Sequence, residues 1–562
     1  MQHLISSAGR KRLLVVAALA LVVLPGAMLA VGSFLGIYVR PTSDDWCGAW
    51  KTRDMGVFGI TRDYYETQNG RVANAFLTGI VYSHGLLGQQ VLPLILVLTL
   101  TAGLVLTLVT LGRRLGWRAP LPVVLAVVLV VEMLLFFAGT RPYQALLWAP
   151  GTISHTLPGI VAVWSGLLAV WAGRRGGRPA RWGSLGYALV TGAVVGTLSE
   201  PFTVVSGVFL GAAAVVLLVP SMRRRVGSWY PFTWCAAWCV GLVVGFTVLY
   251  TSPGARWRRE QTPSAASPLS DRQLHLEVHD WIRVWHSIGG TWSYLGALAV
   301  GLLLGLSVTG RPRPQNGTAA AAGAAADAPD ESGPGAPRHP FGDLSRRWTW
   351  TLLALPVPLL GISSFGVVVG LRMGYGGRGW TYGRAWTNFL FPMLLLLVVY
   401  GVLIGRQAAR RLTADSTAGW RLPALFAVGL ASAATGIAAA VHLVPVVDHM
   451  TSSTVVRAQA WDRQNALIHR ETENGATVVT YHPLVVPQLA EPFIVRSYAK
   501  DWAAACVAHY YDVTRIQKPP APHSLAARQT VPQHKPRPKP KARPGQKPHH
   551  QQKQAAGGTG GH

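Results

Sequence analysis

Two adjacent carboxylates, Asp44 and Asp45, follow the first long apolar segment of the chain. A carboxylate at the edge of an apolar region is costly to keep charged, so it usually has a cation, a metal or a reacting group as partner. Such an aspartate can act as a general base toward a sugar hydroxyl or bind a divalent cation, Mg or Mn. The alternative is structural, with the pair capping a helix or pairing with Arg53 or Arg71. The two residues alone leave both readings open.

Arginines and glycines alternate with aromatic residues in a second informative segment, 371–388, which contains Arg372, Arg378 and Arg384. A guanidinium binds two phosphate oxygens at once, and glycines let the backbone approach a ligand closely. These arginines are therefore candidates for binding a phosphate group. The alternative is that they pair with aspartates or backbone carbonyls.

Other polar residues are weaker candidates. His155 precedes Pro158 and could hydrogen-bond a phosphate or a sugar, or it could be an ordinary interfacial histidine. Glu132 is the one acid inside an apolar segment, where acids are usually functional, although pairing with Arg141 would also explain it. The remaining candidates for contact with a substrate are Glu66, Asn69, Arg71 and Glu200.

The composition indicates that membrane-spanning helices position these residues. The chain has 562 residues, of which 50% are hydrophobic and 13% charged, and its mean hydropathy is +0.30. Soluble domains are about 25% charged, and disordered chains are poor in apolar residues, so both classes are excluded. Apolar runs long enough for a bilayer predict about eleven spans. They lie at 13–37, 91–111, 120–138, 157–172, 183–198, 202–219, 232–250, 291–309, 348–370, 389–405 and 422–446.

Basic residues cluster in alternate loops, which predicts the orientation. Pairs or triplets such as Arg113-Arg114 and Arg223-Arg224-Arg225 recur in one set of short loops, whereas acids collect in the other set. The positive-inside rule places the basic loops and the N-terminus in the cytoplasm, and the C-terminus outside. The net charge is +28, and these loops together with the basic C-terminal tail account for it. We therefore expect no nucleic acid among the partners.

The chain divides into five predicted parts. Residues 1–310 hold the first eight spans, with the first outer loop, the candidate for catalysis, at 38–90. Residues 311–347, rich in Ala, Gly and Pro, form a flexible cytoplasmic linker. Residues 348–446 hold the last three spans, and 447–516 form a small extracytoplasmic α/β domain. Residues 517–562 form a disordered polycationic tail, which could bind anionic wall polymers or lipid head groups or could be a solvated extension.

Four cysteines are present, and two of them, Cys47 and Cys506, fall on the predicted outer side. Disulfides persist outside the cytoplasm, so a Cys47–Cys506 bond would tie the small domain to the first loop. The sequence does not show that the two approach each other. Cys235 and Cys239 are read as small buried residues of one helix.

A set of short motifs resembles the GT-C superfamily, which comprises polytopic glycosyltransferases that use polyprenyl-phosphate-linked sugars. The likeness is to bacterial relatives of the O-antigen glucosyltransferases. The motifs are Ser43-Asp44-Asp45-Trp46, Asn69-Gly70-Arg71, Gly151-Thr-Ile-Ser-His155-Thr156, Ser199-Glu200, Asp501-Trp502 and Ala508-His509-Tyr510-Tyr511. The resemblance implies a GT-C-like all-α fold and a catalytic base in the first outer loop, which by position is Asp44 or Asp45.

The sequence thus favours a cell-envelope glycosyltransferase of the cell membrane. Its expected partners are a polyprenyl-phosphate sugar donor, a cell-wall or glycan acceptor and membrane lipids. Two rivals remain: a transporter or flippase of lipid-linked sugars, and a non-catalytic assembly or tethering protein that uses the basic tail.

Overall fold

The computed structural model describes residues 7–261, 270–310, 346–413, 421–484 and 497–519, which are almost entirely helical. Contacts divide the chain into two units, Met1–Gln517 and Lys518–His562, and every helix and strand of the described residues lies in the first. Nearly all of the predicted linker and of the predicted tail lie outside the described residues. The described part has the character of an all-α polytopic membrane protein.

Each predicted apolar segment overlaps a helix. These are α1 (Ser7–Phe34), α4 (Leu86–Arg114), α5 (Leu121–Phe137), α8 (Leu157–Arg175), α9 (Arg178–Leu198), α10 (Glu200–Leu218), α12 (Tyr230–Thr251), α15 (Leu295–Ser307), α17 (Pro356–Tyr375), α18 (Thr387–Thr413) and α19 (Arg421–Glu473).

Eight helical segments of the described residues are long and apolar enough to cross a membrane. A ninth is added if α14 (Asp271–Gly289) and residues 292–307, which meet at 68°, form one broken span. Two predicted spans fall short: α5 has 17 residues, and α9 begins with the polar run Arg178-Pro-Ala-Arg181.

Paired glycines let helices of the bundle pack closely. Gly192 and Gly196 of α9 face Gly241 and Gly245 of α12, and a Cβ atom on Gly192 would lie 2.4 Å from the carbonyl oxygen of Trp238. In the same way Gly301 and Gly305 of α15 face Gly401 and Gly405 of α18. Small residues four apart are a common way for membrane helices to bring their backbones together.

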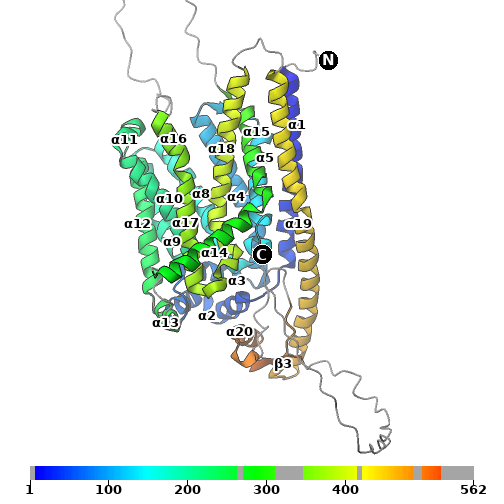
Figure 1. Cartoon of the computed structure of the whole chain (residues 1–562). Coiled ribbons are helices and arrows are strands. Elements are labelled where there is room, and N and C mark those ends of the chain that lie inside the picture. The colour runs from blue at the N-terminus through cyan, green and yellow to red at the C-terminus, as the bar shows by residue number, and fades with distance from the viewer. Residues whose placement is uncertain (1–6, 262–269, 311–345, 414–420, 485–496, 520–562) are drawn as a thin grey trace, which may run out of the picture. The chain divides into compact units, whose positions relative to one another are not determined.

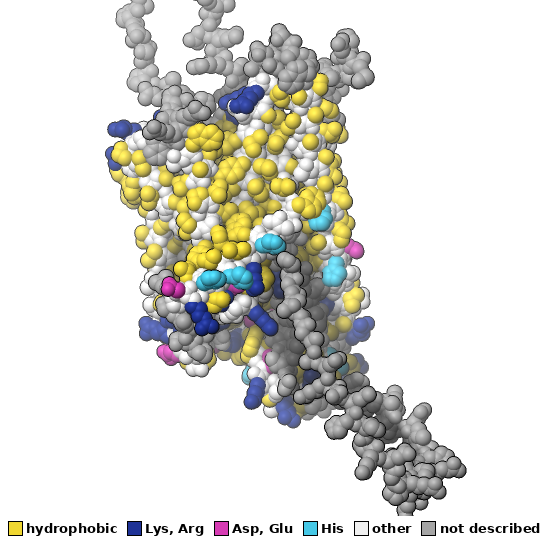
Figure 2. All heavy atoms as spheres, viewed as in Figure 1, with side chains coloured by type: hydrophobic (Ala, Val, Ile, Leu, Met, Phe, Trp, Pro, Cys, Tyr) yellow, Lys and Arg dark blue, Asp and Glu magenta, His cyan; other side chains and the backbone are white. Residues whose placement is uncertain are grey.

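The two ends of the bundle differ in content (Figure 1). One end has the start of α1, the basic helix α11 (Pro220–Val226), α16 (Arg346–Ala354) and a two-residue antiparallel pairing of β1 (Trp117–Arg118) with β2 (Thr309–Gly310). On the face shown in Figure 2, charged side chains lie toward the ends and an apolar band lies between them. This distribution is the one expected for a protein that crosses a bilayer.

The opposite end holds the short elements that connect the long helices. The predicted first outer loop is mostly helical, since it contains α2 (Asp44–Thr67) and α3 (Val72–Tyr82) after a 3₁₀ turn, η2 (Leu35–Tyr38). The other short elements are α6 (Pro142–Leu146), α7 (Ala149–His155), α13 (Pro253–Gln261), η3 (Trp292–Tyr294), η4 (Gly376–Thr381) and η5 (Gly383–Trp386).

The small C-terminal domain begins within the last long helix, α19, without a break in that helix. The last predicted span ends at residue 446, where the small domain was expected to begin, but α19 runs unbroken from Arg421 to Glu473 through Pro445. Gly475, at φ +86°, turns the chain into β3 (Val478–Thr480). This strand pairs in parallel with β4 (Arg515–Gln517), and η7 (Tyr498–Lys500) and α20 (Trp502–Tyr510) precede β4.

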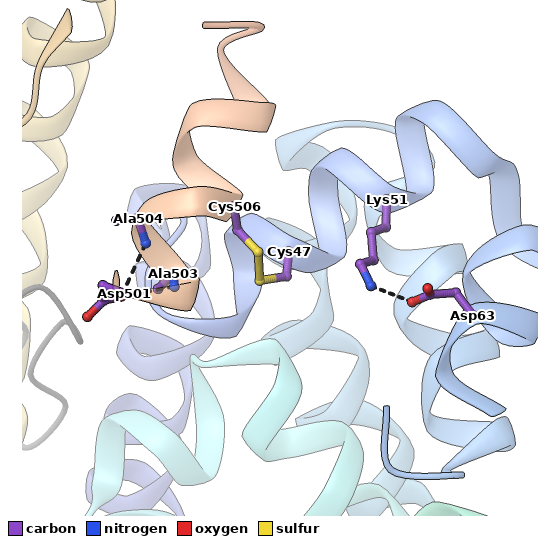
Figure 3. Close-up of a disulfide and its surroundings, with 7 residues drawn as sticks. All are labelled: Cys47, Lys51, Asp63, Asp501, Ala503, Ala504 and Cys506. Atoms are coloured by element: carbon purple, nitrogen blue, oxygen red, sulfur yellow. Dashed lines mark hydrogen bonds and ion pairs between the residues drawn. A yellow bond between two sulfur atoms is a disulfide. The ribbon is translucent and has the colours of Figure 1, made fainter. Parts of the chain in front are cut away.

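A disulfide joins this domain to the first outer segment. Cys47 of α2 and Cys506 of α20 are bonded, with their Cα atoms 4.9 Å apart (Figure 3). Beside it, Trp46 is fully buried in the core of the domain, where it contacts the rings of Trp461, Tyr481, Tyr510 and Tyr511. The domain therefore folds around a side chain supplied by α2.

Candidate functional site

The first turn of α2 places the two adjacent carboxylates in opposite surroundings. Asp45 is 1% exposed, accepts a hydrogen bond from the backbone N–H of Thr42 at 2.9 Å and accepts a second from the hydroxyl of Tyr82. Burial raises the pKa of Asp45 to about 7, although both hydrogen bonds oppose the shift. Asp45 is thus engaged in holding α2 against α3.

Asp44 is only half-buried, and within the described residues its carboxylate accepts no hydrogen bond from a side chain or a backbone N–H. Burial raises its pKa, while the positive charges of Arg384, Arg71 and Arg258 lower it. Asp44 is thus a carboxylate without a hydrogen-bond donor among the described residues, and the arginines that act on it come from distant parts of the chain. Such a group can accept a proton from a bound hydroxyl.

Strained backbone precedes Asp44. Ser43 has φ +53°, a conformation that side chains other than glycine rarely adopt. Asp512, at φ +54°, is the other such residue among the described part of the chain. Non-glycine residues in this region cost about 1–3 kcal/mol and often occur at functional sites. Here the strained residue orients the first turn of α2.

Arg71 reaches the site from the start of α3, where it forms an ion pair of 2.7 Å with Glu200 of α10. The preceding Gly70 has φ +73°, and a Cβ atom there would lie 2.1 Å from the hydroxyl of Ser252. Asn69 caps the same turn, since its side-chain oxygen accepts from the backbone N–H of Arg71 at 3.1 Å. The Asn69-Gly70-Arg71 motif is therefore a turn that positions the side chain of Arg71 beside Glu200.

Arg384 lies on η5 and has no carboxylate bound to it among the described residues. Its guanidinium lies over the rings of Trp148 and Tyr382, at 5.0 and 4.8 Å from their centroids, and donates to Gln144 at 3.3 Å. Aromatic faces orient an arginine without neutralising its charge. The charge of Arg384 remains available to an anionic ligand.

The other two arginines of segment 371–388 do not share this setting. Arg372 forms a buried ion pair with Asp280 of α14, so its charge is already matched. Arg378 is exposed on η4, and among the described residues its guanidinium forms no hydrogen bond or ion pair. The structure therefore brings only Arg384 of the three close enough to act on Asp44 electrostatically.

His155 ends α7 and is 9% exposed, with its Nδ1 atom 3.1 Å from the side-chain nitrogen of Asn388. A cavity of about 10 Å³, room for about one water molecule, lies beside this pair. His155 interacts electrostatically with Arg384 and Arg71. It borders the cationic region rather than forming part of its surface.

Two further candidates, Glu66 and Glu132, bind partners outside the region around Asp44. Glu66 is exposed and pairs with Arg62, one helical turn before it, at 2.9 Å. Glu132 accepts a hydrogen bond from Thr101 of α4 at 2.9 Å. Arg53, considered above as a partner of the aspartates, binds Asp54 and Asp512 instead. Within the described ranges, no group of three or more His, Cys, Asp or Glu side chains is arranged to hold a metal ion.

Contacts on the far side of α2 hold the first turn in place. Gly56, at φ +70°, folds α2 back on itself, and Lys51 pairs with Asp63 across the bend (Figure 3). Arg457 of α19 donates to the backbone oxygens of Arg40 and Pro41, which lead into the turn. The position of Asp44 is thus fixed from the small domain, from α19 and from within α2.

Sequence reasoning did not identify several residues of this region. Tyr82, which binds Asp45, is part of an apolar helix and carries no distinguishing signal. Asp280, which neutralises Arg372, is 92 residues distant from its partner. Gln144 and Trp148, which contact Arg384, lie 240 and 236 residues before it in the chain.

No family model, curated protein or solved structure matches the chain. The likeness to the GT-C superfamily therefore depends on the short motifs of the sequence alone.

Proposed function

We propose that the protein is an integral membrane glycosyltransferase of the GT-C type. It would transfer a sugar from a polyprenyl-phosphate carrier to a cell-envelope acceptor on the extracytoplasmic side of the membrane. The end of the bundle that contains α2, α3 and η5 would be the extracytoplasmic end, in agreement with the location of the disulfide and of the basic loops at opposite ends.

One observation supports this proposal above the others. Asp44 has no hydrogen-bond donor among the described residues, although it lies in the field of Arg384 and Arg71. A base and an anion site must lie together in a reaction that removes a proton from a hydroxyl and releases a phosphate. The hydrogen bond from Tyr82 to Asp45 supports Asp44, rather than Asp45, as the proposed base.

In the proposed reaction, the carboxylate of Asp44 takes the proton of the acceptor hydroxyl. The hydroxyl oxygen forms a bond to the anomeric carbon as the bond from that carbon to the phosphate oxygen breaks. The electron pair of the broken bond leaves with the polyprenyl phosphate, whose charge Arg384 stabilises. A single displacement of this kind inverts the anomeric centre.

Arg384 offers the test of the donor site. We expect Arg384→Ala to weaken the binding of polyprenyl phosphate to the purified protein about 30-fold, because a charged hydrogen bond contributes about 2 kcal/mol. Arg384→Lys should weaken the binding of polyprenyl phosphate less, because lysine keeps the positive charge and loses only the bidentate hydrogen bonds of the guanidinium.

Arg378→Ala is the matched control, because Arg378 comes from the same segment, is exposed, and its guanidinium forms no hydrogen bond or ion pair with a described residue. It should bind as the wild type does. Equal affinity of the wild type, Arg384→Ala and Arg378→Ala would contradict the proposed donor site.

A further inference from the structure

A cavity of about 470 Å³ opens between α4 and α8 near the C-terminal ends of both helices. These ends lie at the basic end of the bundle, away from α2, the helix that begins with Asp44 (Figure 1). The cavity is independent of the proposed catalytic site and needs an explanation of its own.

The walls of the cavity are apolar and come from one face of each helix. Leu106, Thr110 and Arg113 are spaced by four and three residues along α4, and Trp164, Leu168 and Trp171 follow the same spacing along α8. From Trp164 to Arg174 the helix rises about 15 Å. The cavity is therefore a groove between α4 and α8 that is long enough to hold a substantial part of an acyl chain.

The mouth of the groove is cationic. Arg113 and Arg174 line it, and neither side chain forms a hydrogen bond or an ion pair with the described residues. Arg114 is held across the two helices by a hydrogen bond of 3.0 Å to the backbone oxygen of Val170, and it interacts electrostatically with Arg174. Three arginine charges therefore meet at one end of an apolar groove, with no described carboxylate bound to any of them.

We infer that this groove binds an anionic glycerophospholipid, with an acyl chain along Leu106 and Trp164 and the phosphate at Arg113 and Arg174. The groove matches both parts of such a molecule, an apolar chain and a negatively charged head. A zwitterionic lipid fits less well, because its ammonium group would face the same three arginines.

The test uses the purified full-length protein in detergent and two short-chain lipids, phosphatidylglycerol and phosphatidylcholine. Native mass spectrometry and the shift in melting temperature both report binding. We expect the wild type to bind phosphatidylglycerol at least tenfold more tightly than phosphatidylcholine. We expect Arg113→Ala/Arg174→Ala to weaken phosphatidylglycerol binding about 30-fold, or about 2 kcal/mol at 1.4 kcal/mol per tenfold.

Two further variants separate the groove from the general charge of this end. Arg224→Ala removes an exposed arginine of α11 that does not line the cavity, so it should bind phosphatidylglycerol as the wild type does. Leu168→Trp fills the groove and keeps both arginines, so it should also weaken binding. The inference is overturned if the double variant binds phosphatidylglycerol normally, or if Leu168→Trp does. It is also overturned if inorganic phosphate or polyprenyl phosphate displaces the lipid at equal concentration.

Discussion

Asp44 and Asp45 occupy neighbouring positions on α2, but their surroundings give them different chemistry. Asp45 is buried and bonded to Tyr82 and Thr42, which suits a structural role. Asp44 is half-buried and lies in the field of Arg384 and Arg71 without a hydrogen-bond donor in the described chain, which suits a reactive one. At the residue scale, the account depends on this difference.

The raised pKa of Asp45 leads to a prediction about stability. Its pKa rises from 3.8 to about 7 on folding, so between these values the unfolded chain loses the proton first. The free energy of unfolding should therefore fall as the pH rises through this window, by up to about 4 kcal/mol. Asn in place of Asp45 stays neutral, and its side-chain oxygen can accept from the backbone N–H of Thr42 while its amide nitrogen donates to the hydroxyl of Tyr82.

We therefore expect Asp45→Asn to match the wild type in melting temperature near pH 4, where the loss begins, and to exceed it increasingly up to pH 8. Melting curves of the purified protein across this range measure the effect. Glu66→Gln is the control, because Glu66 is exposed and pairs only with Arg62. A constant difference between Asp45→Asn and the wild type from pH 4 to pH 8 would contradict the assignment.

The residues of the candidate site were only partly predictable from the sequence. Asp44, Arg71 and Arg384 stood out because charged residues beside apolar segments and among glycines are rare. Sequence spacing could not separate Arg384 from Arg372, because the carboxylate that neutralises Arg372 is Asp280 on another helix. Nor could it separate Asp44 from Asp45, since the deciding hydroxyl of Tyr82 belongs to α3.

At the scale of the elements, α2 is held from three directions. The disulfide fixes it to α20, the ring of Trp46 fills the core of the small domain, and the Lys51–Asp63 pair closes its bend. The first turn of α2, which carries Asp44, is adjacent to all three. We therefore regard the small domain as a support for the proposed catalytic residue.

Breaking the disulfide should loosen this support. The bond closes a loop of 459 residues, so we expect Cys47→Ser/Cys506→Ser to lower the free energy of unfolding by about 2–4 kcal/mol. Limited proteolysis should then cut the small domain sooner than in the wild type. Cys235→Ser/Cys239→Ser, which forms no disulfide, is the control. Unchanged proteolysis in the Cys47/Cys506 variant would count against the supporting role.

The helices themselves were predictable, and their packing was less so. Long apolar runs located the apolar helices, because a bilayer requires about 20 apolar residues and internally satisfied backbones, but they missed the more polar α2 and α14. The continuity of α19 through Asp448 was not apparent, since its composition changes from apolar to polar while the helix continues. The approach of Gly241 to Gly192 depends on which helices are neighbours, a property of the tertiary fold.

At the scale of the whole molecule, the proposed orientation of the two ends across the membrane can be tested by labelling. Glu473 ends α19 at the end that holds α2, and Arg224 lies on α11 at the other end; both are exposed. In a background lacking Cys235 and Cys239, we expect a membrane-impermeant maleimide to label Glu473→Cys in intact cells. Arg224→Cys should react only after lysis. The opposite pattern would reverse the proposed orientation.

The central claim is that Asp44 removes the proton of the acceptor hydroxyl, and a comparison of Asp44→Asn with Asp45→Asn tests it most directly. Transfer of labelled sugar from the polyprenyl-phosphate donor in proteoliposomes measures turnover, and binding of the donor is measured in parallel. We expect Asp44→Asn to lower turnover by about 10²–10⁴-fold with donor binding nearly unchanged, because a general base acts on the transition state. Asp45→Asn should retain most of the activity. Full turnover in Asp44→Asn would contradict the account.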